Sequence, residues 1–255
     1  CGAGFGIVEA TGGGGLPVTV RSVEPTLIGK ATSIAGKSVR IADDNAEIAK
    51  WLHRLDNAED SDFEDIKQPD GTSKAINHTR DKPLLTSSGA AMSVPLPGKG
   101  KDFEVVGIPL KKYGFHVVEL ASPALGNALL GRKVPRYVAA GALVTDMAGH
   151  FKWGRESPPV WVAKLGTGAP GAHAGLPVTD SCTGKPIVWG STDRTGRLLI
   201  KGSLPEPEIN GDCDYGAAHP LLVSARLGED MSFTLTSWTK GIAPYDFELP
   251  FGWSA

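Results

Sequence analysis

Short runs of alternating apolar and polar residues, separated by turns that contain glycine or proline, restrict the fold of this chain more than any other feature. The clearest series lies in 160–201, where strand-like segments alternate with glycine-containing turns. Further along, 220–226 and 231–238 are predicted to form a hairpin across the turn 227–230. Strands at a spacing of roughly 8–12 residues are typical of β-sandwiches. The 33 glycines and 19 prolines also favour many turns over long helices. The sequence therefore predicts an all-β fold.

The predicted strands form two groups. Between them, 123–135 contains Gly126, Gly131 and Pro135, and its apolar residues follow no clear period. We therefore predict two tandem antiparallel β-sandwich domains of immunoglobulin-like type, one in 1–125 and one in 126–255. Each half has about the size that is common for this architecture.

One segment of the first half follows a helical period instead. Asp44 stands at an N-cap position with Glu47 three residues later, which is the spacing of a capping box. Four apolar residues then recur on one face of a helix: Ile48, Trp51, Leu52 and Leu55. We predict a short amphipathic helix near 44–56, inserted in the first sandwich and covering one open end of it. The polar residues 57–82 are predicted to form a surface loop or excursion.

The overall charge does not indicate a strongly charged partner. The chain carries 26 basic and 28 acidic residues, a net charge of −2. This balance gives no electrostatic reason to expect binding to nucleic acid or to an anionic membrane. No apolar run reaches the roughly 18 residues that a membrane-spanning helix needs.

Motifs that carry chemistry are missing from the sequence. It contains neither the GxSxG motif nor the HExxH motif, and the glycine tract 12–15 is not followed by Lys-Ser or Lys-Thr. A triad built from distant residues stays open. We predict that the chain is not an enzyme, with no catalytic, cofactor-binding or metal-binding residues.

Two groups of residues could in principle supply metal ligands. The acidic run 59–65 could supply oxygen ligands to calcium, but it lacks the EF-hand spacing, so we predict a solvated loop. No two of the six histidines stand at helical i, i+4 positions. His116 and His150 fall on predicted strands and are expected to be packed or edge residues.

The cysteines suggest a disulfide. Cys182 and Cys213 lie 31 residues apart and form no CxxC pair, so a zinc site is disfavoured. A disulfide between them would stabilise the fold by roughly 3–4 kcal/mol in the chain-entropy model. Two reduced thiols are the alternative.

Three tryptophans lie on predicted strands of the second half. Trp153, Trp161 and Trp189 could line a sugar-binding face, because indole rings serve as platforms for ligands. A tryptophan on an alternating strand is more often part of a sandwich core, so we predict that all three are buried.

An ordered set of segments resembles a known family. In the second half these segments resemble a macroglobulin domain of bacterial alpha-2-macroglobulins: 151–157, 160–162, 167–170, 183–184, 189–193, 224–226 and 232–244. Upstream, 16–24 and 114–120 look like the macroglobulin domain that precedes it. The resemblance implies that both sandwiches are macroglobulin-like, and that the helix near 44–56 is an insertion.

The resemblance also implies a function. Members of this family are large periplasmic proteins, often lipid-anchored to the inner membrane, that trap foreign proteases in defence. Their activity depends on a bait segment and, in some members, on a Cys-Gly-x-Gln thioester. Neither is identifiable here, because Cys1-Gly2 is followed by Ala3-Gly4 and the other two cysteines lack the glutamine.

The chain is therefore predicted to be a non-catalytic scaffold without a cofactor. Its expected partners are neighbouring macroglobulin domains and, through the full-length protein, target proteases. A membrane is expected only through a lipid anchor at or before the start of this chain, and Cys1 is either a lipidated cysteine or the first residue of an excised piece. The alternative function is an extracytoplasmic adhesin or a carbohydrate-binding module.

Overall fold

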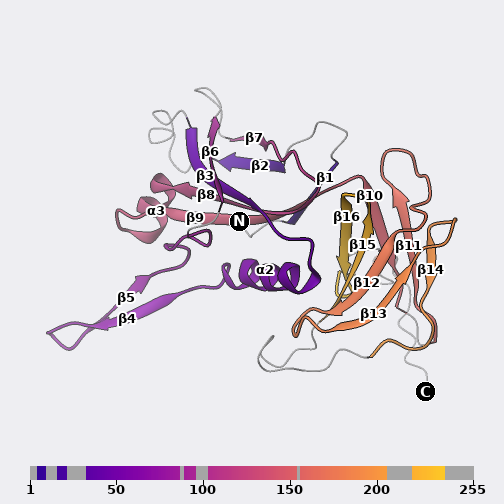
Figure 1. Ribbon diagram of the computed structural model, residues 1–255. Coiled ribbons are helices and arrows are strands. Elements are labelled where there is room, and N and C mark those ends of the chain that lie inside the picture. Colours follow the sequence, from indigo (N-terminus) through magenta and orange to yellow (C-terminus); the bar gives the residue numbers. More distant parts are fainter. Residues whose placement is uncertain are drawn as a thin grey trace, which may run out of the picture.

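The chain folds mainly into β-sheets. A computed structural model describes residues 5–9, 16–21, 33–86, 89–95, 103–153, 156–205 and 220–238. Within these residues the chain forms sixteen strands, β1 to β16, and two short helices, α2 and α3. The predicted fold class is thus confirmed. Figure 1 shows one β-rich body for each half of the chain, with α2 between them.

A five-stranded sheet organises the first body. Its spatial order is β1 (Phe5–Glu9), β9 (Arg136–Thr145), β8 (Gly114–Ser122), β3 (Ser33–Arg40) and β6 (Ala90–Pro95). Its pairings are antiparallel except that of β1 with β9, which is parallel. A two-stranded sheet, β2 (Leu16–Arg21) with β7 (Phe103–Ile108), accompanies it. Ile108 packs with Val118 and Val144 of the large sheet in one buried cluster.

The second body is a sandwich of two antiparallel sheets. One sheet has the order β13 (Pro186–Ser191), β12 (Gly175–Asp180), β15 (Leu221–Leu227) and β16 (Asp230–Leu235). The other has the order β10 (Met147–Phe151), β11 (Pro159–Lys164) and β14 (Arg197–Leu199). Alternate residues of both sheets, such as Val160, Leu176 and Val223, form the core between them. The hairpin predicted for β15 and β16 is confirmed.

The predicted helix is present as α2 (Asn45–Asn57). Asp44 caps it by accepting a hydrogen bond of 3.0 Å from the backbone of Glu47. The Glu47 side chain does not reach back to the cap, because it accepts a bond from the Trp51 indole at 3.0 Å instead. One of the two hydrogen bonds of the predicted capping box is therefore formed. The Glu47 side chain, which would form the other, orients Trp51 instead.

Helix α2 was predicted to cover one open end of the first sandwich. It lies between the two bodies instead. Its apolar face belongs to a core shared by α2, the first sheet, β15 and β16. The Phe115 and Phe233 rings, one from each body, meet edge to face with their centroids 5.5 Å apart. Each large side chain buried in this core contributes about 1.5–3 kcal/mol. The members of this shared core are Ile41, Ile48, Trp51, Leu55, Leu85, Phe115, Val117, Ala139, Leu143, Leu222, Met231 and Phe233.

The covalent connection between the bodies is very short. Only Asp146 separates β9 of the first sheet from β10 of the sandwich. Asp230 stabilises the junction between β9 and β10, because its carboxylate accepts hydrogen bonds from the Thr145 hydroxyl at 2.7 Å and from the Asp146 backbone at 3.1 Å. The Tyr113 phenol donates to Asp146 at 2.6 Å, and this bond raises the pKa of Tyr113 to about 12.

Two elements were missed or misjudged from the sequence. Helix α3 (Pro123–Leu130) occupies the segment that was predicted to be an irregular boundary. It starts at Ser122, which caps it, and ends at Gly131 in the left-handed conformation. Strand β9 follows it and pairs with β8, although it lies beyond residue 126, where the second domain was predicted to begin. The division of the chain at 125 stays a prediction.

The segment 57–82 is an excursion from the first body, one of the two predicted alternatives, but it is not a loop throughout. It contains an antiparallel hairpin, β4 (Phe63–Lys67) with β5 (Ser73–Asn77), which projects from the first body in Figure 1. All residues of β4 are exposed, including Phe63. The polar composition suggested a loop because neither face of this hairpin is buried, so its strands lack the usual apolar alternation.

We expect Asn45 to stabilise the contact between the bodies. Its side-chain amide donates to Thr179 at 2.9 Å and accepts from the Ser224 hydroxyl at 2.8 Å and from Arg226 at 3.0 Å. Replacing it in Asn45→Ala leaves buried polar groups unpaired, so the free energy of unfolding should fall by about 2–3 kcal/mol. Urea unfolding monitored by circular dichroism measures this. The control Asn57→Ala, exposed on the same helix, should change it by less than about 0.5 kcal/mol. Equal effects of both variants would contradict the proposed role of Asn45.

Candidate functional site

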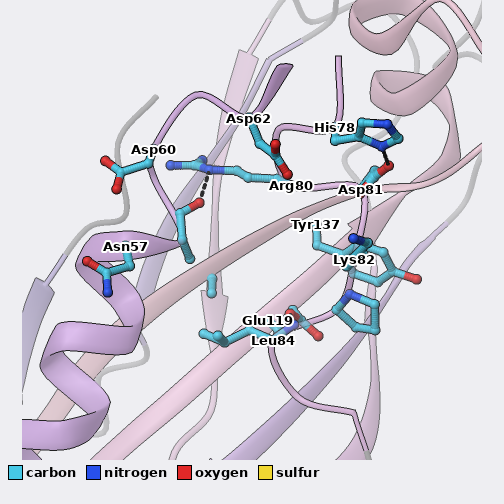
Figure 2. A pocket seen from close by; sticks show the side chains of 13 residues that line it. Asn57, Asp60, Asp62, His78, Arg80, Asp81, Lys82, Leu84, Glu119 and Tyr137 are labelled. Carbon is cyan, nitrogen blue, oxygen red and sulfur yellow. Dashed lines mark hydrogen bonds and ion pairs between the residues drawn. The ribbon is translucent and has the colours of Figure 1, made fainter. Parts of the chain in front are cut away.

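A cavity of about 270 Å³ lies where the projecting hairpin joins the first body. Figure 2 shows its polar side chains, which come from the end of α2, from the segments on either side of the hairpin and from strands β8 and β9. The cavity carries several titratable groups. It is lined by Asn57, Ala58, Asp60, Asp62, His78, Arg80, Asp81, Lys82, Pro83, Leu84, Glu119, Tyr137 and Ala139.

His78 joins the hairpin to the body. Its Nδ1 lies 2.8 Å from Asp81 and its Nε2 lies 3.1 Å from Glu64 on β4. The hydrogen bond with Asp81 raises the pKa of His78, and the bond with Glu64 raises it further. Both ring nitrogens can donate to carboxylates at once only when the imidazole is protonated. The two carboxylates thus favour the charged form of His78, and Arg132, whose Nη2 lies 3.1 Å from Nδ1, opposes it without reversing the upward shift of the pKa.

Asp81 is the buried partner in this network. Burial alone would raise the pKa of Asp81, but hydrogen bonds from His78 and Arg132 lower it overall. Arg132, which follows α3, donates to the same carboxylate oxygen as His78 and also to the Asn77 carbonyl at 3.2 Å. The network thus ties β4, β5 and the segment after α3 together at the base of the hairpin.

Glu119 forms the floor of the cavity. It lies on β8, is 4% exposed, and accepts a hydrogen bond from the Leu84 backbone at 2.5 Å. Burial raises its pKa, against the lowering effect of the bonds from Leu84 and Leu85. Lys37 donates to the carbonyls of Leu85 and Thr86, so the two side chains clamp one loop onto the sheet. The role of Glu119 here is to hold this loop.

The arrangement offers little for a reaction. None of the described lining residues is Ser, Thr or Cys, so serine, threonine and cysteine nucleophiles are missing from this wall. Both nitrogens of His78 are taken by carboxylates that also hold the hairpin. No three described His, Cys, Asp or Glu side chains are placed to hold a metal ion. The geometry supports a structural clamp, and the predicted absence of catalytic and metal sites stays a prediction.

The sequence alone could not indicate this network. His78 and Asp81 lie three residues apart, which is a weak local signal. Glu64 and Arg132 reach them only through the fold. Of the histidines on predicted strands, His116 is buried on β8 and its Nε2 lies 2.7 Å from the Lys112 carbonyl. His150 is exposed on β10, an edge strand of its sheet.

The prediction that three tryptophans form core is wrong. Trp153, Trp161 and Trp189 are 39%, 47% and 73% exposed. The reason lies in the phase of the strands, because the valines on either side of Trp161 point into the sandwich and turn the indole outward. Trp161 and Trp189 lie on the outer faces of different sheets, on opposite sides of the core. They therefore cannot form one common platform.

The candidate disulfide is described only in part. Cys182 is disulfide-bonded, and it lies in the turn after β12. Cys213 and Cys1 fall outside the described residues, so the pairing of Cys182 with Cys213 stays a prediction. Neither described helix is long and apolar enough to cross a membrane.

The fold defines a class of protein: an all-β protein with a β-sandwich in its second body, in which polar clusters hold neighbouring elements together. Residues 144–254 match the family model for the bacterial alpha-2-macroglobulin MG3 domain. This match confirms the resemblance to bacterial alpha-2-macroglobulins that was drawn from the sequence. No curated protein matches the chain.

Solved structures of one such protein share the fold. The crystal structure of native alpha-2-macroglobulin from Escherichia coli spanning domains NIE-MG1 is 13% identical, with a TM-score of 0.50, over 87% of this chain and 88% of that chain. A second structure, spanning MG0-NIE-MG1, is also 13% identical, with a TM-score of 0.51, over 88% of this chain and 58% of that chain. At this identity the likeness shows the fold alone.

We expect the stability gained from His78 to depend on pH. Because the folded pKa is raised, this stability is fully present below the ordinary histidine pKa of about 6.5 and is lost as the pH rises through the folded pKa. Asp81→Asn should lower the pKa of His78 more than Glu64→Gln does, since Asp81 is the larger cause. Titration of the His78 imidazole by NMR measures both shifts. An unshifted His78 in the unaltered chain would contradict the clamp.

We predict that Cys182 pairs with Cys213. Proteolysis without reduction should yield one peptide pair that contains both residues, detected by mass spectrometry. Cys213→Ser should remove this pair and lower the free energy of unfolding by about 3–4 kcal/mol under oxidising conditions. The same variant should cost far less under reducing conditions, where the unaltered chain also lacks the bond. A Cys182 peptide linked to any other cysteine would contradict the pairing.

Proposed function

We propose that this chain is a non-catalytic scaffold section of a bacterial alpha-2-macroglobulin-like protease inhibitor that works in the periplasm. The observation that carries the proposal is the match of 144–254 to the MG3 domain model. The inhibitor would trap foreign proteases, and this section would position the neighbouring macroglobulin domains. Proteases would be partners only of the full-length protein, and an inner-membrane lipid anchor would hold it at its place of action.

The shared core supports a scaffold role. A scaffold section must hold its neighbouring domains at fixed positions, so its own parts should not move relative to each other. In this chain α2 is buried against both bodies, and a single residue, Asp146, joins β9 to β10. Interfaces between domains that are small and polar leave room for motion, whereas this contact is a continuous apolar core. We infer that the chain acts as one stiff unit in a larger frame.

One observation supports the alternative function, an adhesin or a carbohydrate-binding module. The three exposed tryptophans are what it requires. Their arrangement weakens it, because Trp161 and Trp189 face opposite sides of the sandwich. The scaffold function therefore remains the better supported of the two.

The scaffold proposal predicts a difference between the chain alone and its full-length parent. The isolated 255-residue chain should not slow the digestion of a protein substrate by a broad-specificity protease, even in molar excess. The full-length protein should inhibit, and deletion of the section that matches this chain should abolish inhibition. Residual protease activity against a labelled protein substrate measures this. Stoichiometric inhibition by the isolated chain would show that the scaffold proposal is wrong.

A further inference from the structure

The outer face of the β10–β11–β14 sheet carries an unusual set of side chains. Its inner face lines the sandwich core through Met147, Val160 and Val162. Strand alternation therefore directs the residues between them outward. The pairing sets His150 opposite Trp161, and Trp161 opposite Arg197, so these three form one row across the sheet.

A second row extends the same face. Pro159 pairs with Leu199, and the exposed Lys152 and Lys201 continue the alternation just past the ends of β10 and β14. The Lys152 backbone donates to the Pro159 carbonyl at 3.1 Å, so the sheet pairing continues to that point. We call this set the basic-aromatic face, and it comprises His150, Lys152, Pro159, Trp161, Arg197, Leu199 and Lys201.

The basic-aromatic face combines apolar exposure with positive charge. Trp161 is 47% exposed and Leu199 is 60% exposed. Three cationic side chains surround them, and the remaining outward positions, Ala148 and Ala163, carry no charge. Asp193 lies in the turn before β14, where its carboxylate already accepts bonds from Thr195 and from the backbone of Arg197. Asp146, just before β10, continues the same alternation at the far end of the face, where its carboxylate accepts a bond from the Tyr113 phenol. The strands β10, β11 and β14 themselves carry no carboxylate on this face, so the part around Trp161 and Leu199 presents positive charge.

The side chains of the basic-aromatic face fit an anionic lipid surface better than they fit an acidic sugar. A sugar site needs amide or carboxylate side chains that bond to hydroxyl groups, and usually a concave shape. The outward positions supply neither amides nor carboxylates, and the cavity described above lies in the other body. A flat surface with exposed Trp and Leu among Lys and Arg instead matches the interface of a bilayer, where indoles and cations concentrate.

We propose that the basic-aromatic face is a contact surface for an anionic membrane. Lys152, Arg197 and Lys201 attract the negative headgroups, and the Trp161 and Leu199 side chains enter the interfacial region. This contact would lie on the folded domain itself, and it needs no lipid anchor and no membrane-spanning helix. It does not depend on the proposed protease trapping.

The test uses sedimentation of the purified 255-residue chain with lipid vesicles. The chain should bind vesicles of phosphatidylcholine that contain phosphatidylglycerol, and should not bind vesicles of phosphatidylcholine alone. The double variant Arg197→Gln and Lys201→Gln should bind about 25-fold more weakly, from about fivefold for each cation. Added salt should weaken binding of the unaltered chain. Failure to bind the anionic vesicles would overturn the proposal.

Matched variants locate the contact. Trp161→Ala should weaken binding several-fold, whereas Trp189→Ala should not, because Trp189 is more exposed but lies on the opposite sheet. In vesicles with brominated acyl chains, tryptophan fluorescence should be quenched in the unaltered chain and in Trp189→Phe. Quenching should be lost in Trp161→Phe. Equal behaviour of the two positions would overturn the assignment to this face, as would binding of a soluble acidic polysaccharide together with no quenching.

Discussion

The burial of helix α2 between two β-layers is the contact on which the rest of the structure depends. Ile48, Trp51 and Leu55 fill the space between the first sheet and the outer face of β15 and β16. Without the helix, both of these faces would expose apolar residues. Asn45 then fixes the helix in register on the sandwich, because its amide fits only one set of partners on β12 and β15. Apolar burial supplies the stability of this contact, and the amide specifies its geometry.

The sequence predicted those elements whose own residues carry the signal. The helix near 44–56 had its cap and its apolar face, and the β15–β16 hairpin had clear alternation, so both were found. Helix α3 is short, and the signals at its ends, Ser122 and Gly131, were outweighed by the lack of a period. The β4–β5 hairpin could not be recognised, because a hairpin without a buried face has no reason to alternate.

Tertiary contacts decide the features that the sequence missed. His78 joins Glu64 and Asp81 because a hairpin folds one strand beside the next, and Arg132 arrives from beyond α3. Nothing in the local sequence of any one of them indicates the others. The tryptophans illustrate the same limit, since a strand pattern shows which residues share a face but not which face is buried. Only the partner sheet decides that Val160 and Val162 point inward and Trp161 outward.

For a related reason, net charge does not show how charge is distributed over the surface. A value of −2 for the whole chain gave no cause to expect an anionic partner. The sum averages over surfaces that a partner meets separately, and the fold collects Lys152, Arg197 and Lys201 around Trp161 on one sheet. At physiological salt, charges interact over about 8 Å, so a partner senses the face it touches and not the acidic residues of 59–65, which lie at and just before β4 in the other body. Because the shared core makes the two bodies one stiff unit, contact through this single face would orient the whole section, which is the property that a scaffold requires.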